Sequence, residues 1–135
     1  MKVIILNGSP KTNGNTSTAL HEVEQTLHQQ GIETEWIHVG HLHIHGCIAC
    51  NKCQKNGICT FHDIVNEISP KMHDADGLLI GSPVYFASPN GSLLSLLDRL
   101  FYSNLHTDWC MKVGASVCIA RRGGATTSMD TLNKY

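Results

Sequence analysis

Continuous apolar runs alternate along the chain with stretches that have helical spacing. Three runs, Val3 to Leu6, Gly77 to Gly81 and Lys112 to Ala120, contain almost no charged positions. Such runs are typical of parallel strands that are buried on both faces. A fourth segment, Glu33 to Val39, alternates apolar with polar residues, which predicts a half-exposed strand at a sheet edge.

Helical spacing predicts three helices between these strands. The first runs from about Thr16 to Gln30, with Gly31 as the residue that ends it. A second helix starts near His62 and Asp63, and Pro70 is expected to kink or shorten it. The third is rich in leucine and extends from Ser92 to Asn104.

Alternating strands and helices predict an α/β fold, a doubly wound parallel sheet with right-handed crossovers. Ligands of such folds bind at the carboxyl ends of the strands. Polar loops follow Leu6, Ile80 and Ile119, and all three fall at this end of the predicted sheet. A binding site built from these loops is therefore expected.

The first of these loops has the composition of a phosphate site. It reads Asn7-Gly8-Ser9-Pro10-Lys11-Thr12-Asn13-Gly14-Asn15-Thr16-Ser17 and opens directly into a helix, whose free N–H groups and dipole attract anions. It is neither a P-loop nor a dinucleotide fingerprint. An ordinary capped turn is the alternative. The candidate phosphate contacts are Ser9, Asn15, Thr16 and Ser17, with Lys11 as an added charge.

Several motifs together resemble the NADPH-dependent FMN reductase family of flavodoxin-like proteins. They are Gly8-Ser9-Pro10-Lys11-x-x-Gly14-Asn15-Thr16, Gly81-Ser82-Pro83-Val84-Tyr85-Phe86, Leu97-Asp98-Arg99-Leu100 and Ala120-Arg121-Arg122-Gly123-Gly124. The resemblance implies a flavodoxin-like sheet of order 2-1-3-4-5 and bound FMN. It also implies NAD(P)H as a possible donor, which in such proteins stacks on the flavin.

The second and third loops are then candidates for contact with the flavin ring. The second contributes Pro83, Val84, Tyr85 and Phe86, with core packing of the two aromatic rings as the alternative. The third contributes Arg121, Arg122 and Gly123, with a solvated basic turn as the alternative. No catalytic side chain is expected, because the protein's part in such chemistry is to bind and orient the cofactor.

Four cysteines, Cys47, Cys50, Cys53 and Cys59, are spaced closely enough to converge on one metal centre. Four thiolates suit a [4Fe–4S] cluster or tetrahedral zinc, and free or disulfide-forming thiols are the third possibility. The spacing resembles that of the iron–sulfur flavoprotein branch of the family. Cys118 is expected in the core, and the histidines at positions 41, 43 and 45 on an exposed edge segment.

Size and charge limit the possible functions. The 135 residues predict one domain, and the resemblance implies that this domain, 1–135, binds FMN and carries a cysteine-rich loop at 46–60. A fifth strand and last helix are not apparent, so the domain is expected to be incomplete at its C-terminus, through truncation or because a partner subunit covers the gap. A net charge of −1 argues against nucleic-acid binding, and no stretch is apolar enough to span a membrane. We expect a cytoplasmic protein.

These features predict an FMN-dependent, NAD(P)H-dependent FMN reductase-like oxidoreductase. It would transfer electrons between NAD(P)H or a ferredoxin-like donor and a small-molecule or protein acceptor, through the cluster. The resemblance also implies a homo-oligomer, dimer or tetramer. One alternative is a non-enzymatic electron carrier of the flavodoxin type. The other is a cysteine-based metal or redox module with a vestigial flavin site.

Overall fold

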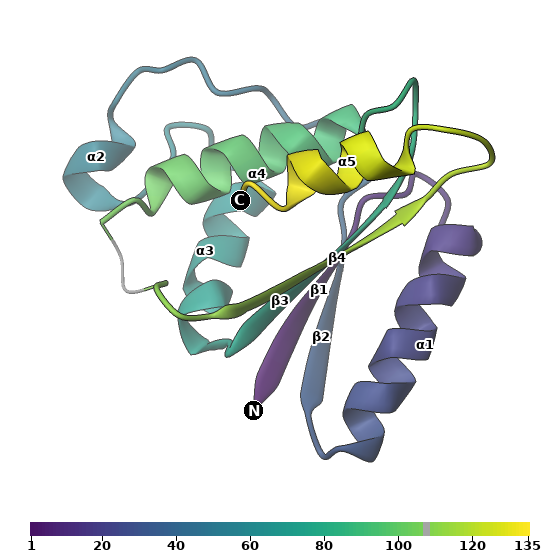
Figure 1. The fold of residues 1–135 in the computed structure, drawn as a ribbon. Coiled ribbons are helices and arrows are strands. Elements are labelled where there is room, and N and C mark those ends of the chain that lie inside the picture. Colours follow the sequence, from purple (N-terminus) through teal and green to yellow (C-terminus); the bar gives the residue numbers. More distant parts are fainter. Residues whose placement is uncertain (107–108) are drawn as a thin grey trace.

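A computed structural model describes residues 1–106 and 109–135. Its sheet has four parallel strands, β1 (Lys2–Asn7), β2 (Glu33–His38), β3 (Gly77–Pro83) and β4 (Val113–Ile119), in the order β2-β1-β3-β4 (Figure 1). Five helices are described: α1 (Asn15–Gln29), α2 (Cys53–Asn56), α3 (Ile64–Asp74), α4 (Gly91–Ser103) and α5 (Ala125–Leu132). This order confirms the predicted flavodoxin-like, doubly wound fold.

The two central strands, β1 and β3, bury side chains on both faces, as their apolar runs predict. Alternate residues of β1 point to opposite sides of the sheet. Ile5 packs with Leu79 of β3 and Leu20 of α1, while Ile4 and Leu6 belong to a larger cluster with α3, α4 and α5. Figure 1 shows α1 on one side of the sheet and α3, α4 and α5 on the other. The two layers hold the carboxyl ends of the strands in fixed positions.

The element boundaries lie close to the predicted ones, and their caps explain them. Gly31, just after α1, has a φ of 72°, the left-handed conformation that glycine adopts at little cost. Asp63 caps α3 by accepting a hydrogen bond of 3.1 Å from the N–H of Val65. Among the described helices, none is both long and apolar enough to cross a membrane.

The structure differs from the prediction in a few elements. At Pro70, where a kink or a shortening was expected, α3 is not shortened and continues to Asp74, because buried Ile68 and Met72 hold the turns on either side of it against the core. The last strand is not buried along its length, since Val113 is 68% exposed. In the described part of the chain β4 pairs only with β3, and its other edge is open. A helix, α5, is also fully formed after β4.

Candidate functional site

Asn7, the last residue of β1, organises the first loop. Its buried side-chain amide donates to Oγ of Ser17 at 2.9 Å, and its side-chain oxygen Oδ1 accepts the N–H of Ser9 at 3.0 Å. The hydroxyl of Ser17 in turn donates to the carbonyl of Thr12. Both sides of the loop are therefore tied to the end of β1, in front of the first turn of α1.

The predicted phosphate contacts differ in exposure. Ser9, Thr16 and Ser17 are buried, while Lys11 and Asn15 are exposed beside them. Oγ of Ser17 is already used within the loop, and Oγ of Ser9 accepts the N–H of Lys11 at 3.1 Å. The O–H of Ser9 keeps its donor capacity. The structure thus places all five residues on one loop and helix start, with different roles available to each.

The N-terminus of α1 has no side-chain cap among the described residues. Gly14 stands at the cap position with extended backbone and contributes no side chain. The N–H groups of a first helical turn lack partners inside the helix and need an outside acceptor. Hydroxyl-bearing residues surround this end, so the arrangement can hold an anion.

The first loop lies directly against the end of β3 and the segment after β2. The N–H of Gly8 donates to the carbonyl of Gly81 at 2.7 Å. An ideal Cβ built on Gly40 would lie 2.2 Å from the carbonyl oxygen of Gly8, so no larger residue fits there without displacing the loop. Three chain segments therefore meet at this corner of the sheet.

The second loop makes a tight turn that exposes its aromatic residues. Tyr85 and Ser88 pair through two backbone hydrogen bonds of 2.8 and 3.0 Å. Phe86 and Ala87 between them have φ values of 48° and 60°, which L-residues seldom adopt. Tyr85 is 48% exposed and Phe86 fully so. Core packing, the alternative for these rings, is therefore wrong, and an apolar surface faces outward beside Pro83 and Val84.

The third loop contacts the second. The N–H of Val84 donates to the carbonyl of Ile119 at 3.0 Å, where β4 ends. An ideal Cβ on Gly124, which has a φ of 98°, would lie 2.6 Å from Cα of Ala87. Arg121, Arg122 and Gly123 are exposed just before this contact. All three predicted loops thus lie at the carboxyl edge of the sheet, the second and third in direct contact.

The four clustered cysteines line one small cavity. It is bordered by Cys47, Cys50, Cys53 and Cys59 together with Phe61, Arg99 and Tyr102, among others. All four cysteines are free thiols. Burial raises the pKa of the Cys53 thiol, and the nearby Cys59, Cys50 and Cys47 raise it further. The four cysteines thus border the same cavity.

In the described residues, no group of three or more His, Cys, Asp or Glu side chains is arranged to hold a metal ion. The thiols therefore share a cavity without standing at ligand distances from one centre. The histidines at 41, 43 and 45 are exposed as predicted. Cys118 packs against the core, also as predicted, and burial raises its pKa.

Arg99 is a residue of this cavity that the sequence reasoning did not select. Its side chain is 1% exposed within the leucine-rich α4, and its Nε donates to Sγ of Cys59 at 3.3 Å. A charged residue in the middle of an apolar helical face was the available signal, because such residues are rarely buried without a partner. The motif Leu97-Asp98-Arg99-Leu100 served only as a family marker.

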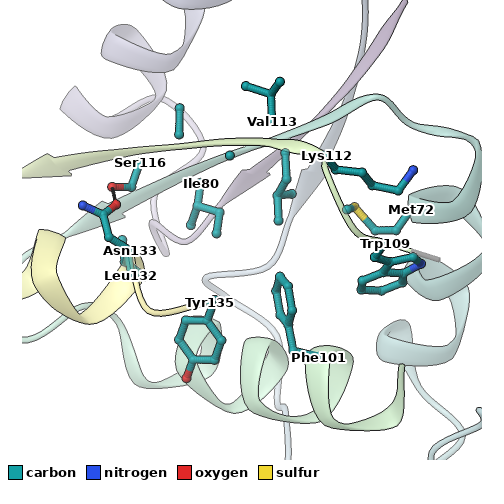
Figure 2. A pocket seen from close by; sticks show the side chains of 13 residues that line it. Met72, Ile80, Phe101, Trp109, Lys112, Val113, Ser116, Leu132, Asn133 and Tyr135 are labelled. Carbon is teal, nitrogen blue, oxygen red and sulfur yellow. Dashed lines mark hydrogen bonds between the residues drawn. The ribbon is translucent and has the colours of Figure 1, made fainter. Parts of the chain in front are cut away.

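A separate hollow of about 450 Å³, lined by both apolar and polar residues, lies beside β4. Figure 2 shows Phe101, Trp109 and Tyr135 around it, with the hydrogen-bonded pair Ser116 and Asn133 at one side. It lies along residues 113–116, the first half of β4. The three loops lie beyond the other end of the strand, so this hollow is not part of the loop site.

Comparison with known proteins identifies relatives over the whole chain. The family model described as NADPH-dependent FMN reductase matches residues 1–135. An iron-sulfur flavoprotein of Methanocaldococcus jannaschii is 37% identical over all of this chain and 71% of its own length. One of Methanosarcina thermophila is 26% identical over all of this chain and 72% of its own length.

A solved structure supports the same fold. RosB, crystallised with 8-demethyl-8-formylriboflavin-5′-phosphate, superposes with a TM-score of 0.74 at 17% identity. The superposition covers 99% of this chain, which spans only 57% of the RosB chain. The family model and the sequence relatives confirm the resemblance carried by the loop motifs, and the chain belongs to the NADPH-dependent FMN reductase family of flavin-dependent oxidoreductases.

Proposed function

We propose that the three loops bind FMN and that its phosphate binds at the first. The observation that carries this proposal is the uncapped N-terminus of α1 beside a loop tied to Asn7. Ser9 and Thr16 would donate hydroxyl hydrogen bonds, and the first-turn N–H groups would complete the site. Exposed Lys11 and Asn15 would add contacts from the rim, while Ser17 keeps the loop in shape.

The flavin ring would lie against the second and third loops. Exposed Tyr85 and Phe86 offer apolar surface next to Pro83 and Val84. Backbone N–H groups of this turn can donate to the polar edge of a ring and so influence its electronics. Arg121 and Arg122 would place positive charge nearby, and Gly123 allows close approach of the backbone.

We propose that the protein is an oxidoreductase with NAD(P)H or a ferredoxin-like donor. When bound, FMN supplies the chemistry, since it can accept a hydride from a nicotinamide and release single electrons. The chain's own part is to bind the phosphate, orient the ring and limit access of water. No side chain is assigned as a general acid or base.

We further propose that the cysteine-lined cavity binds a [4Fe–4S] cluster. The donor set fits in kind, because four free thiols border one cavity and Arg99 lies against Cys59. The two relatives are named iron-sulfur flavoproteins, which supports an iron–sulfur cluster of some type. The cluster would supply single-electron transfer. Zinc or a disulfide remains the competing use of these thiols.

Substitution of Thr16 tests the phosphate site. Thr16→Val keeps the shape of a buried side chain and removes its hydroxyl, so we expect FMN affinity to fall roughly tenfold, about 1.4 kcal/mol, through a lost hydrogen bond to a charged group. Thr18→Val is the matched control, because Thr18 is exposed two residues further along α1. Equal affinities of the two variants, measured by quenching of flavin fluorescence, would contradict the phosphate assignment.

Steady-state kinetics separate the proposed enzyme from its alternatives. Turnover of NADPH or NADH with an artificial electron acceptor is the expected result. Bound FMN without turnover would favour a flavodoxin-type carrier, and failure to bind FMN at micromolar protein would favour a thiol-based module. Light scattering would test the proposed homo-oligomer. We place the reaction in the cytoplasm, where thiols such as these stay reduced.

A further inference from the structure

Arg99 is a buried cation in the middle of an apolar helix face. Its neighbours on α4, Leu96, Leu97 and Leu100, are fully buried. A charge in such a position is costly unless it is paired and hydrogen-bonded. An arginine at this position therefore needs specific partners that pair with its charge.

Those partners hold the guanidinium in one orientation. Nη1 and Nη2 donate to the two carboxylate oxygens of Asp63 at 2.7 and 2.8 Å, a bidentate geometry that restricts rotation. Nη1 also donates to the carbonyl of His45 at 3.2 Å, and the group lies 4.9 Å from the centre of the Phe61 ring. Asp63 in turn caps α3, so the pair is anchored to two helices.

This arrangement leaves Nε directed at the sulfur of Cys59, at 3.3 Å. An arginine guanidinium is not deprotonated in proteins, so this side chain is charged at any physiological pH. A single residue connects α4, the start of α3 and the fourth cysteine.

We propose that Arg99 is a positioning residue for the metal centre. Its side chain holds Cys59 in place as a ligand and raises the reduction potential of the bound cluster. This inference rests on the proposed function of the cysteine cavity. Reduction adds one negative charge to a cluster, and an N–H donor to a ligand sulfur stabilises the more negative state. Lysine cannot replace the planar guanidinium of Arg99. Its ammonium is a point charge that cannot hold Asp63 bidentately and also contact Cys59 in a fixed geometry.

The test is a reductive titration with dithionite of anaerobically reconstituted protein. It compares wild type with Arg99→Lys and with Arg99→Met/Asp63→Asn, which removes both charges and keeps a residue that can cap α3. Lys55→Met is the control, because it removes an exposed cation from between Cys53 and Cys59. Iron and FMN contents are measured in parallel.

We expect the ratio of reduced to oxidised cluster at a fixed potential to be at least tenfold lower in both Arg99 variants. For a one-electron couple, a tenfold change corresponds to a reduction potential about 59 mV lower. The Lys55→Met protein should titrate like wild type. Loss of iron with FMN retained would also support the inference, because the FMN loops then report an intact fold.

Two results would overturn the inference while leaving the proposed function intact. One is an unchanged potential and iron content in both Arg99 variants. The other is a joint loss of iron and FMN in both, which would make Arg99 a general support of the fold. A wild-type protein that takes up no iron would overturn the proposed cluster and this inference with it.

Discussion

Gly124 joins the two loops to which we assign the flavin ring, and Gly124→Ala tests that junction. A new Cβ would lie 2.6 Å from Cα and 2.9 Å from Cβ of Ala87, whereas carbon atoms in contact prefer about 3.5–4.0 Å. These two atoms belong to Ala87, whose backbone is held between the Tyr85–Ser88 hydrogen bonds, and Cγ1 of Val84 would lie 3.1 Å away. One of the two loops must therefore move.

The expected cost has two parts. The φ of 98° at Gly124 costs an L-residue about 1–2 kcal/mol. Displacing the overlapping loop adds about 1–3 kcal/mol, as overpacking does elsewhere. We expect the free energy of unfolding to fall by about 2–5 kcal/mol, which lowers Tm by about 5–20 °C in a domain of this size.

Urea unfolding in the absence of flavin measures this loss, and Gly123→Ala is the adjacent control because no atom lies within 4 Å of its built Cβ. FMN affinity should fall at least tenfold in Gly124→Ala. Gly114→Ala, on β4 and equally unobstructed, is the control for affinity. If Gly124→Ala unfolds like Gly123→Ala, the described contact between the loops is refuted.

Two further substitutions give independent predictions. Phe86→Asn should raise the free energy of unfolding by up to about 1 kcal/mol, because asparagine tolerates the left-handed φ of 48° better than phenylalanine does. It should also weaken FMN binding, because it removes the aromatic ring surface. A variant less stable than wild type would contradict the first expectation. Burial raises the pKa of Glu24, but hydrogen bonds from Thr34, His21 and Trp36 outweigh it and the pKa falls below its ordinary 4.5. A carboxylate with a lowered pKa stabilises the fold above its unfolded pKa, and this contribution is lost as the pH falls through the folded value. Glu24→Gln should therefore lose less stability than wild type on acidification below about pH 4.5, which unfolding followed by tryptophan fluorescence would measure. Exposed Glu22→Gln is the control. Parallel pH curves for Glu24→Gln and wild type would contradict the prediction.

The parts of the fold that depend on local pattern were predictable. The apolar run ending at Leu6 and the polar loop after it are adjacent in sequence, and the structure keeps them adjacent. The loops after Ile80 and Ile119 could also be placed, because parallel strands bring their carboxyl ends to one edge. The exposure of Val113 was not predictable from its strand, since it depends on what lies beside β4.

Contacts between distant residues explain the remaining differences. Arg99 meets Asp63, 36 positions away, and Cys59, 40 positions away, and no local pattern encodes such a meeting. The left-handed backbone at Phe86 also lacks a sequence signal, because glycine or asparagine would be expected there. It is set by the pairing of Tyr85 with Ser88 and places an aromatic ring in solvent at the proposed flavin site.

The most direct test of the account is anaerobic purification followed by an absorption spectrum and assays for flavin, iron and acid-labile sulfide. We predict one FMN per chain, with flavin peaks above a broad shoulder, and about four iron and four sulfide per chain. Flavin without iron would contradict the proposed cluster and return the cysteines to a structural or thiol-redox role. The absence of both would contradict the central claim that these loops form a working flavin site.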